Sequence, residues 1–336
     1  MPALLAELTT LRLGGPVTDL VEATSAEQIV AAIADAGDAL LVLGGGSNLV
    51  AADEGWPGRV VLIRSRGITI TDVAGGVDVT AQAGEPWDEM VERTLAEGLS
   101  GLETMSGIPG LTGATPIQNV GAYGAEIADV LTALTVYDRE SGVTRVWTPA
   151  ECGFAFRSSA FKHTDRYVIL DVTMRLARRS ASVPIRYAEL ARILGIAPAS
   201  SAPATDVRAA VLALRRSKGM VLDATDHDSW SVGSFFVNPL VDVVPEAARE
   251  CPQWVTDGRT KLSAAWLIER AGFPRGYGNE RVRLSTKHTL ALTNRGGAST
   301  ADLLALAAEI RAGVENRFGI RLRPEAHLAA NIDWPL

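Results

Sequence analysis

Residues 101–124, GLETMSGIPGLTGATPIQNVGAYG, form the first segment whose composition points to chemistry. The segment contains six glycines and two prolines, and Glu103 is its only formally charged residue. Glycine permits positive φ angles and lets bare backbone approach a ligand, while proline stiffens the path between the glycines. Backbone N–H groups presented in this way can bind an anionic or polar ligand. Because loops of this length are usually functional, we interpret the segment as a ligand-binding loop, with a glycine-rich crossover that binds nothing as the alternative.

A second glycine loop, GGGSN at residues 44–48, follows a short apolar run at 39–43. The dinucleotide-binding motif G-x-G-x-x-G does not fit this loop, because Leu49 stands where the last glycine would be. The P-loop motif G-x-x-x-x-G-K-[ST] does not occur in the chain either. Two interpretations therefore stay open, a phosphate site and a plain strand-to-helix turn.

Ser234 is a candidate for side-chain chemistry. It follows Gly233 and precedes Phe235 and Phe236, so its hydroxyl group is expected in partly desolvated surroundings. No G-x-S-x-G elbow surrounds it, which argues against an acyl-transfer nucleophile. Proton donation to a carbanion fits a neutral hydroxyl better. The alternative is a serine whose hydrogen bonds are satisfied by the backbone of a turn.

Two further charged groups each allow two interpretations. Glu325, after a short strand expected at 320–323, either steers protons and stabilises charge or forms a surface ion pair. The cations Arg215, Arg216 and Lys218 end a predicted helix, where they either complement the helix dipole or bind a diphosphate. The four histidines and two cysteines lack metal-ligand spacing, so we expect no metal site.

The elements that position these groups are a mixture of helices and strands, which indicates an α+β protein. Ser25 and Gln28 form a capping-box pattern ahead of an apolar stripe, and Gly37 follows as a stop. Residues 197–204, APASSAPA, read as a linker with nothing to place in a core. Helices are expected from Ser25 to Gly37, from Pro86 to Gly98, and over 206–218, 262–271 and 300–318, and strands over 39–43, 131–137, 143–147 and 167–176.

Length and charge limit the class of protein. The 336 residues are enough for about two domains, and 47% hydrophobic with 21% charged residues is ordinary for a globular protein. A net charge of −7 argues against a general nucleic-acid or anionic-membrane surface. No apolar run reaches the length of about 18 residues needed for a membrane span, and the N-terminus lacks a basic signal region. We expect a cytoplasmic protein without membrane insertion or an obligate protein partner.

Seven strings taken together resemble one family, the UDP-N-acetylenolpyruvoylglucosamine reductases of bacterial peptidoglycan synthesis. The resemblance runs from about residue 10 to residue 328, and the order and spacing of the strings make it specific. The strings are LVLGGGSNLV (41–50), SGIPGLTGATPIQNVGAYG (106–124), FAFRSSAFK (154–162), SVGSFFVNP (231–239), KLSAAWLIERAGF (261–273), STKHTLALTN (285–294) and RPEAHL (323–328).

The resemblance implies an α+β fold with an FAD-binding domain of the vanillyl-alcohol-oxidase (PCMH) type and a smaller α+β substrate-binding domain. The expected ranges are 10–180 for the FAD domain, with subdomains of about 10–65 and 66–180, then 181–205 for a substrate-covering insertion and linker. The range 206–336 is expected to form the C-terminal domain.

The resemblance also implies the cofactors and the reaction. NADPH reduces bound FAD, hydride passes from flavin N5 to the methylene carbon of the enolpyruvyl sugar nucleotide, and protonation of the adjacent carbon gives UDP-N-acetylmuramate. The protein would then be an oxidoreductase acting on a CH–CH bond with NADP as acceptor. The FAD-binding residues implied are Gly44, Gly45, Gly46, Ser47, Asn48, Ile108, Pro109, Gly110, Gln118, Asn119, Gly121, Ala122 and Gly124.

By the same resemblance, Ser234 protonates the carbanion, Glu325 lies near the substrate carboxylate, and Arg157 binds and polarises that carboxylate. Electrostatic stabilisation and a nearby acid are what hydride addition to an enol ether requires. Phe156 departs from the family, which usually has tyrosine there, so it keeps the ring and loses the hydroxyl. Substrate-binding positions implied are Lys218, Asn238, His288 and Tyr187, the last typical of the type I subgroup.

Two other functions remain as alternatives. One is another FAD-dependent oxidoreductase of the same fold, such as an oxidase of small alcohols. The other is a non-catalytic regulator that binds a flavin or a nucleotide. Ser234, Glu325 and Tyr187 in these contexts argue against the first, and the set of Arg157, Ser234 and Glu325 argues against the second.

Overall fold

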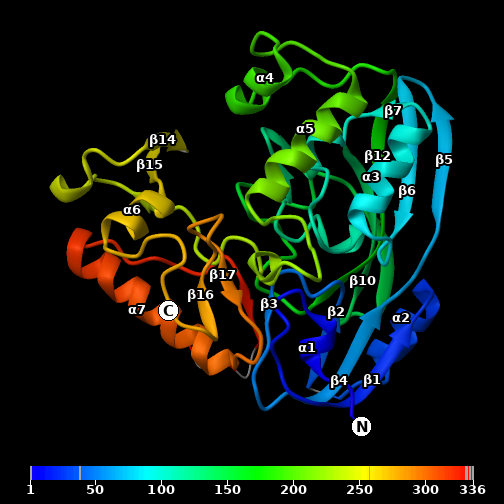
Figure 1. The fold of residues 1–336 in the computed structure, drawn as a ribbon. Helices are drawn as coiled ribbons and strands as arrows, with labels where there is room; N and C mark the ends of the chain where they lie inside the picture. The colour runs from blue at the N-terminus through cyan, green and yellow to red at the C-terminus, as the bar shows by residue number, and fades with distance from the viewer. Residues whose placement is uncertain (1, 38, 257, 330–331, 333, 335–336) are drawn as a thin grey trace. The chain divides into compact units, whose positions relative to one another are not determined.

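The computed structural model describes residues 2–37, 39–256, 258–329, 332 and 334. The chain forms two compact units, each described here by itself (Figure 1). Unit 1 consists of Met1–Thr18, Gly46–Pro57 and Ser217–Leu336, and unit 2 of Asp19–Gly45 and Gly58–Arg216. The expected domain ranges, which follow chain order, remain a prediction; compactness groups residues 181–205 with unit 2.

The first layer of unit 2 is a sheet of strand order β1-β4-β2, with β2 parallel to β4. The expected helix after Ser25 is confirmed as α2, whose first turn is capped because the Ser25 hydroxyl accepts a hydrogen bond from the N–H of Gln28. Ile29, Ala32 and Ile33 on its apolar stripe are buried. The bounds are β1 (Val17–Ala23), α2 (Ala26–Ala34), β2 (Leu40–Leu43) and β4 (Trp56–Ile63).

The second layer of unit 2 is an antiparallel sheet of order β11-β10-β12-β6-β5, with β7 paired to β12. The strands expected near 131, 143 and 167 are all present. Trp87, Met90 and Val91 of α3 are buried in the same core as β6, β10 and β12, and Figure 1 shows α3 beside β6. The bounds are β5 (Ile68–Val73), β6 (Gly76–Gln82), α3 (Trp87–Ala96), β7 (Leu99–Ser100), β10 (Leu131–Asp138), β11 (Val143–Trp147) and β12 (Tyr167–Arg178).

The stretch 197–204 corrects one expectation. Ala202 is buried in a small core with Ile185 and Val207, and Ala204 is also buried, so the prediction that this stretch places nothing in a core is wrong. Small side chains suffice there because the backbone pairs closely, with bridges at residues 185 and 200 and at 181 and 203. The helices on either side are α4 (Ala188–Leu194) and α5 (Ala204–Ser217).

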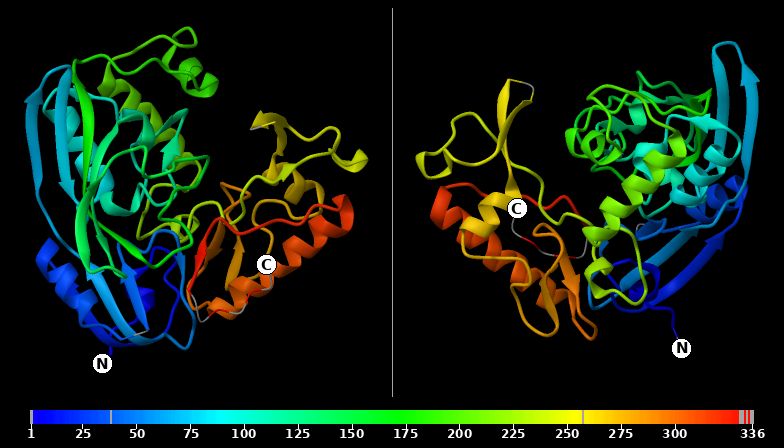
Figure 2. Two further views of the ribbon diagram at one scale, coloured as in Figure 1. Left: turned by 180° about the vertical axis from the view of Figure 1, so that it is seen from behind. Right: turned by 45° about the horizontal axis from the view of Figure 1, so that its top comes forward.

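The core of unit 1 lies along α7, which has the expected bounds 300–318. Its apolar stripe is buried from Leu303 to Phe318, and the helix ends where Gly319 adopts a φ of 67°. Its contacts are with α6 and the hairpin β16–β17, which lies along it in both views of Figure 2. The bounds are α1 (Leu5–Leu8), β3 (Leu49–Val50), β13 (Leu240–Val241), β14 (Gln253–Thr256), β15 (Arg259–Leu262), α6 (Ala264–Arg270), β16 (Val282–Leu284), β17 (Leu292–Asn294), α7 (Thr300–Phe318) and β18 (His327–Leu328).

The strand expected at 320–323 does not form. Backbone pairing begins later, at Pro324, which bridges to Phe236, and continues in β18, parallel to β3. The alternation of apolar residues at Ile320 and Leu322 instead serves burial in the core. This shift matters for the site, because it places the segment around Glu325 beside the segment around Phe236.

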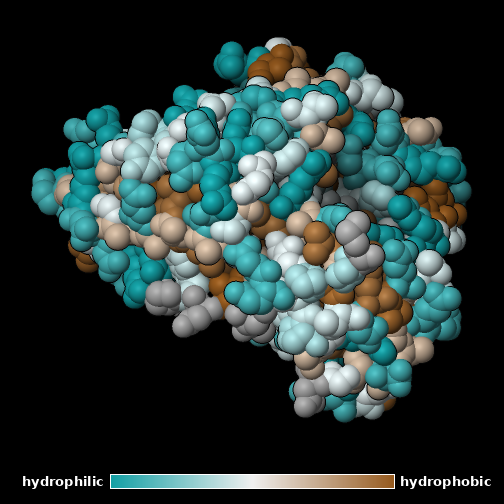
Figure 3. Space-filling model, turned by 60° about the horizontal axis from the view of Figure 1, so that its bottom comes forward, coloured by the Kyte–Doolittle hydropathy of each residue, from teal (hydrophilic) through white to brown (hydrophobic). Residues whose placement is uncertain are grey.

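The surface is mixed in character. Hydrophilic residues cover much of the face seen in Figure 3, and hydrophobic residues occur there in separate patches. Among the helices of the described residues, none has the length and apolar character to cross a membrane.

Candidate functional site

The glycine segment 101–124 of unit 2 is an ordered structure. It contains the short 3₁₀ helices Glu103–Met105 and Thr112–Ala114 and the strand β8 (Gly121–Ala122), which pairs with β9 (Ala125–Glu126) directly after the segment. The N–H of Trp87 donates to the carbonyl of Gly110 at 3.0 Å, and the N–H of Gly113 donates to that of Ala83 at 3.0 Å. A Cβ atom at Gly113 would lie 2.5 Å from Cβ of Ala83, so only glycine fits there. The segment is therefore fixed against the end of β6 by its own backbone.

Two features of the predicted cofactor residues of unit 2 suit a polar ligand. A Cβ atom at Gly45 would lie 2.9 Å from Cα of Gly110, so the two glycine loops approach each other as bare backbone. Oε1 of Gln118 is buried and has no hydrogen-bond partner among the described residues. A buried acceptor of this kind normally has a partner, and a bound ligand with donor groups would provide one. The residues are compatible with FAD.

Arg157 lies against the glycine segment 101–124. Its guanidinium donates hydrogen bonds to the backbone carbonyls of Asn119 at 3.4 Å and Gly121 at 2.9 Å. Arg157 and Asn119 both have positive φ angles, 52° and 46°, which are uncommon outside glycine and concentrate at functional sites. The Phe156 ring is 41% exposed, with its centroid 5.6 Å from Cζ of Arg157. The structure thus brings Arg157 together with two predicted cofactor positions, Asn119 and Gly121.

Tyr187 stands at the N-cap of α4, and its ring makes an edge contact with that of Tyr123 at a centroid distance of 5.3 Å. Tyr123, at a φ of 52°, was missed by sequence reasoning, although it lies inside the glycine segment. Burial raises the pKa of Tyr123 and lowers that of Arg215, whose charge acts on the tyrosine. Arg215 is a half-buried cation whose charge acts on Tyr123, and the helix-end interpretation alone does not describe it.

In unit 1 the structure brings together three of the strings. The N–H of Glu325 donates to the carbonyl of Phe235 at 2.7 Å, and the N–H of Phe235 donates to that of Leu290, also at 2.7 Å. Oγ of Ser234 lies 3.4 Å from Nε2 of His288. Ser234, His288 and Glu325 thus lie on neighbouring segments, although 91 residues separate the first from the last along the chain (325 − 234).

The remaining cofactor positions, Gly46, Ser47 and Asn48, also belong to unit 1. Gly46 has a φ of 60°, and a Cβ atom there would lie 2.3 Å from the carbonyl oxygen of Leu8, so the position requires glycine. The side-chain amide of Asn48 points to the carbonyl of Glu325 at 3.5 Å, and the Asn48 carbonyl accepts a hydrogen bond from the N–H of His327 at 2.8 Å. The glycine loop and the Glu325 segment are therefore adjacent.

The other two predicted substrate residues also lie in unit 1. Oδ1 of Asn238 accepts a hydrogen bond from the N–H of Ala264 at 2.9 Å, so this oxygen supports the start of α6. Lys218 directly follows the last residue of α5 and is half-buried. Arg157 and Tyr187 belong to unit 2.

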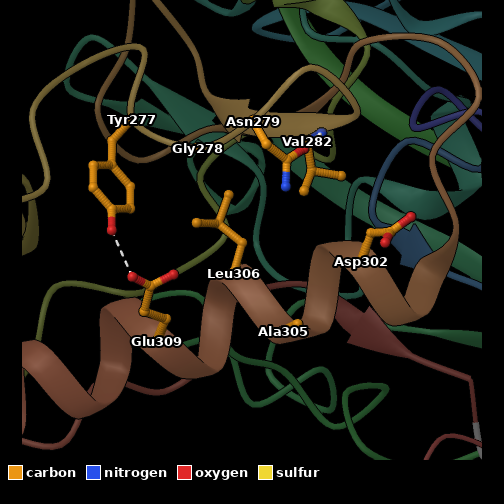
Figure 4. A pocket seen from close by; sticks show the side chains of 8 residues that line it. All are labelled: Tyr277, Gly278, Asn279, Val282, Asp302, Ala305, Leu306 and Glu309. Atoms are coloured by element: carbon orange, nitrogen blue, oxygen red, sulfur yellow. Dashed lines mark hydrogen bonds between the residues drawn. The ribbon is translucent and has the colours of Figure 1, made fainter.

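The structure also shows a pocket of about 370 Å³ along α7 (Figure 4). In it the Tyr277 hydroxyl donates to Oε1 of Glu309 at 2.5 Å. None of the predicted site residues lines it, so it is separate from the candidate site. Within the described ranges, no group of His, Cys, Asp and Glu side chains could hold a metal ion. The pocket is lined by Tyr277, Gly278, Asn279, Val282, Asp302, Ala305, Leu306 and Glu309.

Comparison with known proteins gives consistent matches. Residues 224–329 match the model of the UDP-N-acetylenolpyruvoylglucosamine reductase C-terminal domain, and residues 18–146 match that of an FAD binding domain. The UDP-N-acetylenolpyruvoylglucosamine reductase of Thermobifida fusca is 55% identical over 95% of this chain and 94% of its own length. That of Salinispora arenicola is 54% identical, over 96% and 93%. A solved structure of the Thermus caldophilus enzyme is 26% identical, with a TM-score of 0.69, over 100% of this chain and 98% of the other.

Proposed function

Because the chain belongs to the family of UDP-N-acetylenolpyruvoylglucosamine reductases, FAD-dependent oxidoreductases of peptidoglycan synthesis, we propose that it reduces the enolpyruvyl ether of its UDP-sugar substrate by the family's two-step mechanism. The observation that carries the proposal is the grouping of Ser234, His288 and Glu325 on adjacent segments of unit 1. The product is UDP-N-acetylmuramate, and the site of action is the cytoplasm, where NADPH and UDP-sugars are available.

When bound, FAD that has been reduced by NADPH supplies a hydride from N5 to the methylene carbon of the enolpyruvyl group. The chain's contribution is a cradle of bare backbone with the buried acceptor Gln118 Oε1. The residues proposed to hold the cofactor are Gly44, Gly45, Gly46, Ser47, Asn48, Ile108, Pro109, Gly110, Gln118, Asn119, Gly121, Ala122 and Gly124.

Arg157 is proposed to bind the substrate carboxylate. Its guanidinium is already oriented by two backbone carbonyls, so little side-chain freedom is lost when a carboxylate binds. As negative charge develops on the enolate, a fixed cation stabilises it without further reorganisation. Glu325 is proposed to lie near the same carboxylate end of the substrate, where its own charge influences protonation.

Ser234 is proposed to donate the proton that completes the reduction. Its Oγ–H gives a proton to the carbon next to the methylene, so one O–H bond breaks and one C–H bond forms. Phe235 and Phe236 beside it are fully buried, which keeps water from this side of the hydroxyl. A positioned acid of this kind typically contributes about 10²- to 10⁴-fold to the rate.

Binding of the UDP moiety is assigned to Tyr187, Lys218, Asn238 and His288. The Tyr187 ring is 41% exposed and supported at its edge by Tyr123, which suits an amphipathic ring that covers a diphosphate. Lys218 supplies a compact positive charge for the same group. The UDP-sugar and NADPH are the only partners that the proposal requires.

The test is anaerobic mixing of the prereduced protein with the enolpyruvyl substrate. The proposal expects the flavin to be reoxidised without oxygen and UDP-N-acetylmuramate to be formed. An alcohol oxidase of the same fold would leave the flavin reduced until oxygen is admitted. A regulator without catalytic activity would show either no flavin absorbance after purification or no reoxidation by any substrate.

A further inference from the structure

A histidine side chain lies within hydrogen-bonding distance of the Ser234 hydroxyl. Nε2 of His288 lies 3.4 Å from Oγ of Ser234, and both residues are half-buried. A substrate-binding role for His288 uses its hydrogen-bonding capacity and leaves its ability to carry a proton unexplained. Histidine is the side chain that changes charge near neutral pH.

The loop that carries His288 is held in a defined conformation. Oγ of Ser285 accepts hydrogen bonds from the N–H groups of Lys287 at 3.0 Å and His288 at 3.2 Å. The His288 carbonyl accepts from the N–H of Ala291 at 3.1 Å, which closes the turn. The N–H of Phe235 donates to the carbonyl of Leu290, so the loop and the Ser234 segment are paired by backbone. The contact between Ser234 and His288 is thus built by both chain segments.

Charged groups on the surrounding segments hold this loop from outside. Asp228 accepts hydrogen bonds from the N–H of Thr286 at 3.0 Å and its hydroxyl at 2.6 Å, and it pairs with Arg295 at 3.1 Å. Asp226 pairs with Lys287 of the loop itself at 2.6 Å.

Two further carboxyl groups complete the charged surroundings of the loop. On α6, Glu269 accepts the hydroxyl hydrogen of Thr289 at 2.5 Å. Glu325, on the third segment, is joined to Phe235 through its backbone. At 3.4 Å from Oγ, Nε2 of His288 is placed to exchange a proton with Ser234.

We propose that His288 is a proton-relay residue, which gives a proton to Ser234 as Ser234 protonates the substrate. This inference rests on the proposed function and extends it by one catalytic step. A serine hydroxyl carries a single proton, and each turnover consumes one proton together with one hydride. Without a relay, donation would leave a strongly basic alkoxide in a half-buried site, at a high cost in free energy.

The relay consists of two proton transfers that occur together. Oγ–H of Ser234 transfers its proton to the substrate carbanion while N–H of the His288 imidazolium transfers its proton to Oγ. Ser234 ends as a neutral hydroxyl and His288 as a neutral imidazole, and the imidazole then takes one proton from solvent. The electron pair of the carbanion forms the new C–H bond. The pair of the broken O–H bond stays on Oγ and forms a new O–H bond, and the pair of the broken N–H bond stays on the imidazole nitrogen. The relay therefore adds no oxidant or reductant to the reaction.

The experiment compares the unsubstituted protein with His288→Gln in the second half-reaction. Prereduced protein is mixed anaerobically with the enolpyruvyl substrate over about pH 5 to 9, the range that brackets imidazole titration. Hydride addition reverses unless the carbanion is protonated, so the rate of flavin reoxidation reports completed proton transfer. Glutamine can keep a hydrogen bond to Ser234 but cannot carry a proton, so a purely positional role would be retained in this variant.

The relay predicts that reoxidation of the unsubstituted protein slows as pH rises through the imidazole range. In His288→Gln it should be about 100-fold slower, with this pH dependence lost. Flavin reduction by NADPH should be unchanged. In His288→Ala, added imidazole should restore part of the rate. The matched control is His227→Gln, which should behave as the unsubstituted protein. His227 is a second histidine of unit 1, and its ring makes an edge contact with that of Trp230.

Two outcomes would overturn the relay alone: an unchanged pH profile in His288→Gln, or a rate within about twofold of the unsubstituted protein. If the unsubstituted prereduced protein is not reoxidised at any pH, the proposed function itself fails. A readout independent of turnover is NMR titration of the four histidines. The resonance absent from His288→Gln should shift its titration midpoint in Ser234→Ala, and a midpoint that stays in place would contradict direct coupling.

Discussion

Arg157 in unit 2 and Ser234 in unit 1 are proposed to serve one reaction, yet they are held in different ways. The Arg157 guanidinium lies on two backbone carbonyls of the glycine segment. The Ser234 hydroxyl meets a side chain, His288, from a segment more than fifty residues away, at 3.4 Å. Charge stabilisation needs a group that stays still, whereas proton transfer needs a group that can be recharged. The surroundings of Arg157 therefore favour a fixed position of its charge, whereas those of Ser234 favour proton exchange with a neighbouring side chain.

The rigidity of the glycine segment depends on two carboxyl groups. Glu103 is fully buried, and it accepts hydrogen bonds from the N–H groups of Gly101 at 2.6 Å and Val183 at 2.9 Å. Asp88 of α3 accepts from the N–H of Gly107 at 2.6 Å and binds Arg208 of α5 through both oxygens. The contact between Glu103 and Val183 joins the segment to the stretch that leads to Tyr187. Asp88 joins the segment to the helices α3 and α5.

The largest expected effect is that of Ser234→Ala on the proton-transfer side of the comparison. Turnover should fall by about 10³-fold because the acid is lost, while flavin reduction by NADPH should persist, since the acid acts only after hydride transfer. Stopped-flow measurement of the two half-reactions checks this. Ser231→Ala, in the same segment, is the control and should keep both rates. Equal losses in both half-reactions for Ser234→Ala would show that its role is misassigned.

Next in size is Glu103→Ala on the rigid side. The substitution leaves two buried N–H groups without their acceptor, so the free energy of unfolding should fall by about 2–4 kcal/mol. Denaturant unfolding monitored by circular dichroism measures the change. Glu89→Ala, on an exposed ion pair with Arg66, should change stability by less than about 0.5 kcal/mol. A loss for Glu103→Ala as small as that of the control would contradict the anchoring role.

Lys218→Ala should have a moderate effect on substrate binding. Loss of a diphosphate contact predicts about tenfold weaker binding of the UDP-sugar, and binding by the unsubstituted protein should depend more strongly on salt than binding by the variant. Titration calorimetry at two salt concentrations measures both. Arg216→Ala also removes a cation from the end of α5 but should leave affinity unchanged. Similar behaviour of the two variants would favour the helix-dipole interpretation of Lys218.

The smallest effect concerns Asp88 and pH. Burial on its own raises the pKa of Asp88, but hydrogen bonds from Arg208 and from the N–H of Gly107 outweigh it, so the pKa lies below its ordinary value of 3.8. A carboxyl group whose pKa is lower in the folded state stabilises the fold at pH values above its pKa in the unfolded state. This stabilisation is lost as the pH falls below about 3.8 and through the pKa of the folded state. Because the group is partly exposed, the contribution is about 1 kcal/mol.

Asp88→Asn should therefore be less stable than the unsubstituted protein at neutral pH, and the gap should narrow in acid. Urea unfolding at a series of pH values tests the sign. Asp72→Asn, in an exposed pair with Arg178, should show a much smaller gap at every pH. A gap for Asp88→Asn that widens on acidification would mean that the pKa is raised in the folded state.

Local patterns in the sequence predicted much of the fold. The helix over 300–318 followed from apolar spacing and a terminal glycine, and the strands of the larger sheet followed from β-branched and aromatic runs between turns. These signals act over a few residues, so they can be read without tertiary context. The failures, the strand at 320–323 and the linker at 197–204, occurred where small or alternating residues were buried by partners distant in sequence.

The sequence by itself determined the family, the presence of two glycine loops, and the identities of Arg157, Ser234 and Glu325 as candidates. Only the tertiary structure decided what each of these groups touches. The structure pairs residue 324 with 236, brings the ring of Tyr123 against that of Tyr187, and brings His288 to Ser234. The partners are 88, 64 and 54 positions apart along the chain (324 − 236, 187 − 123 and 288 − 234). Such contacts depend on how whole segments pair and pack, and no pattern within one segment encodes its partner.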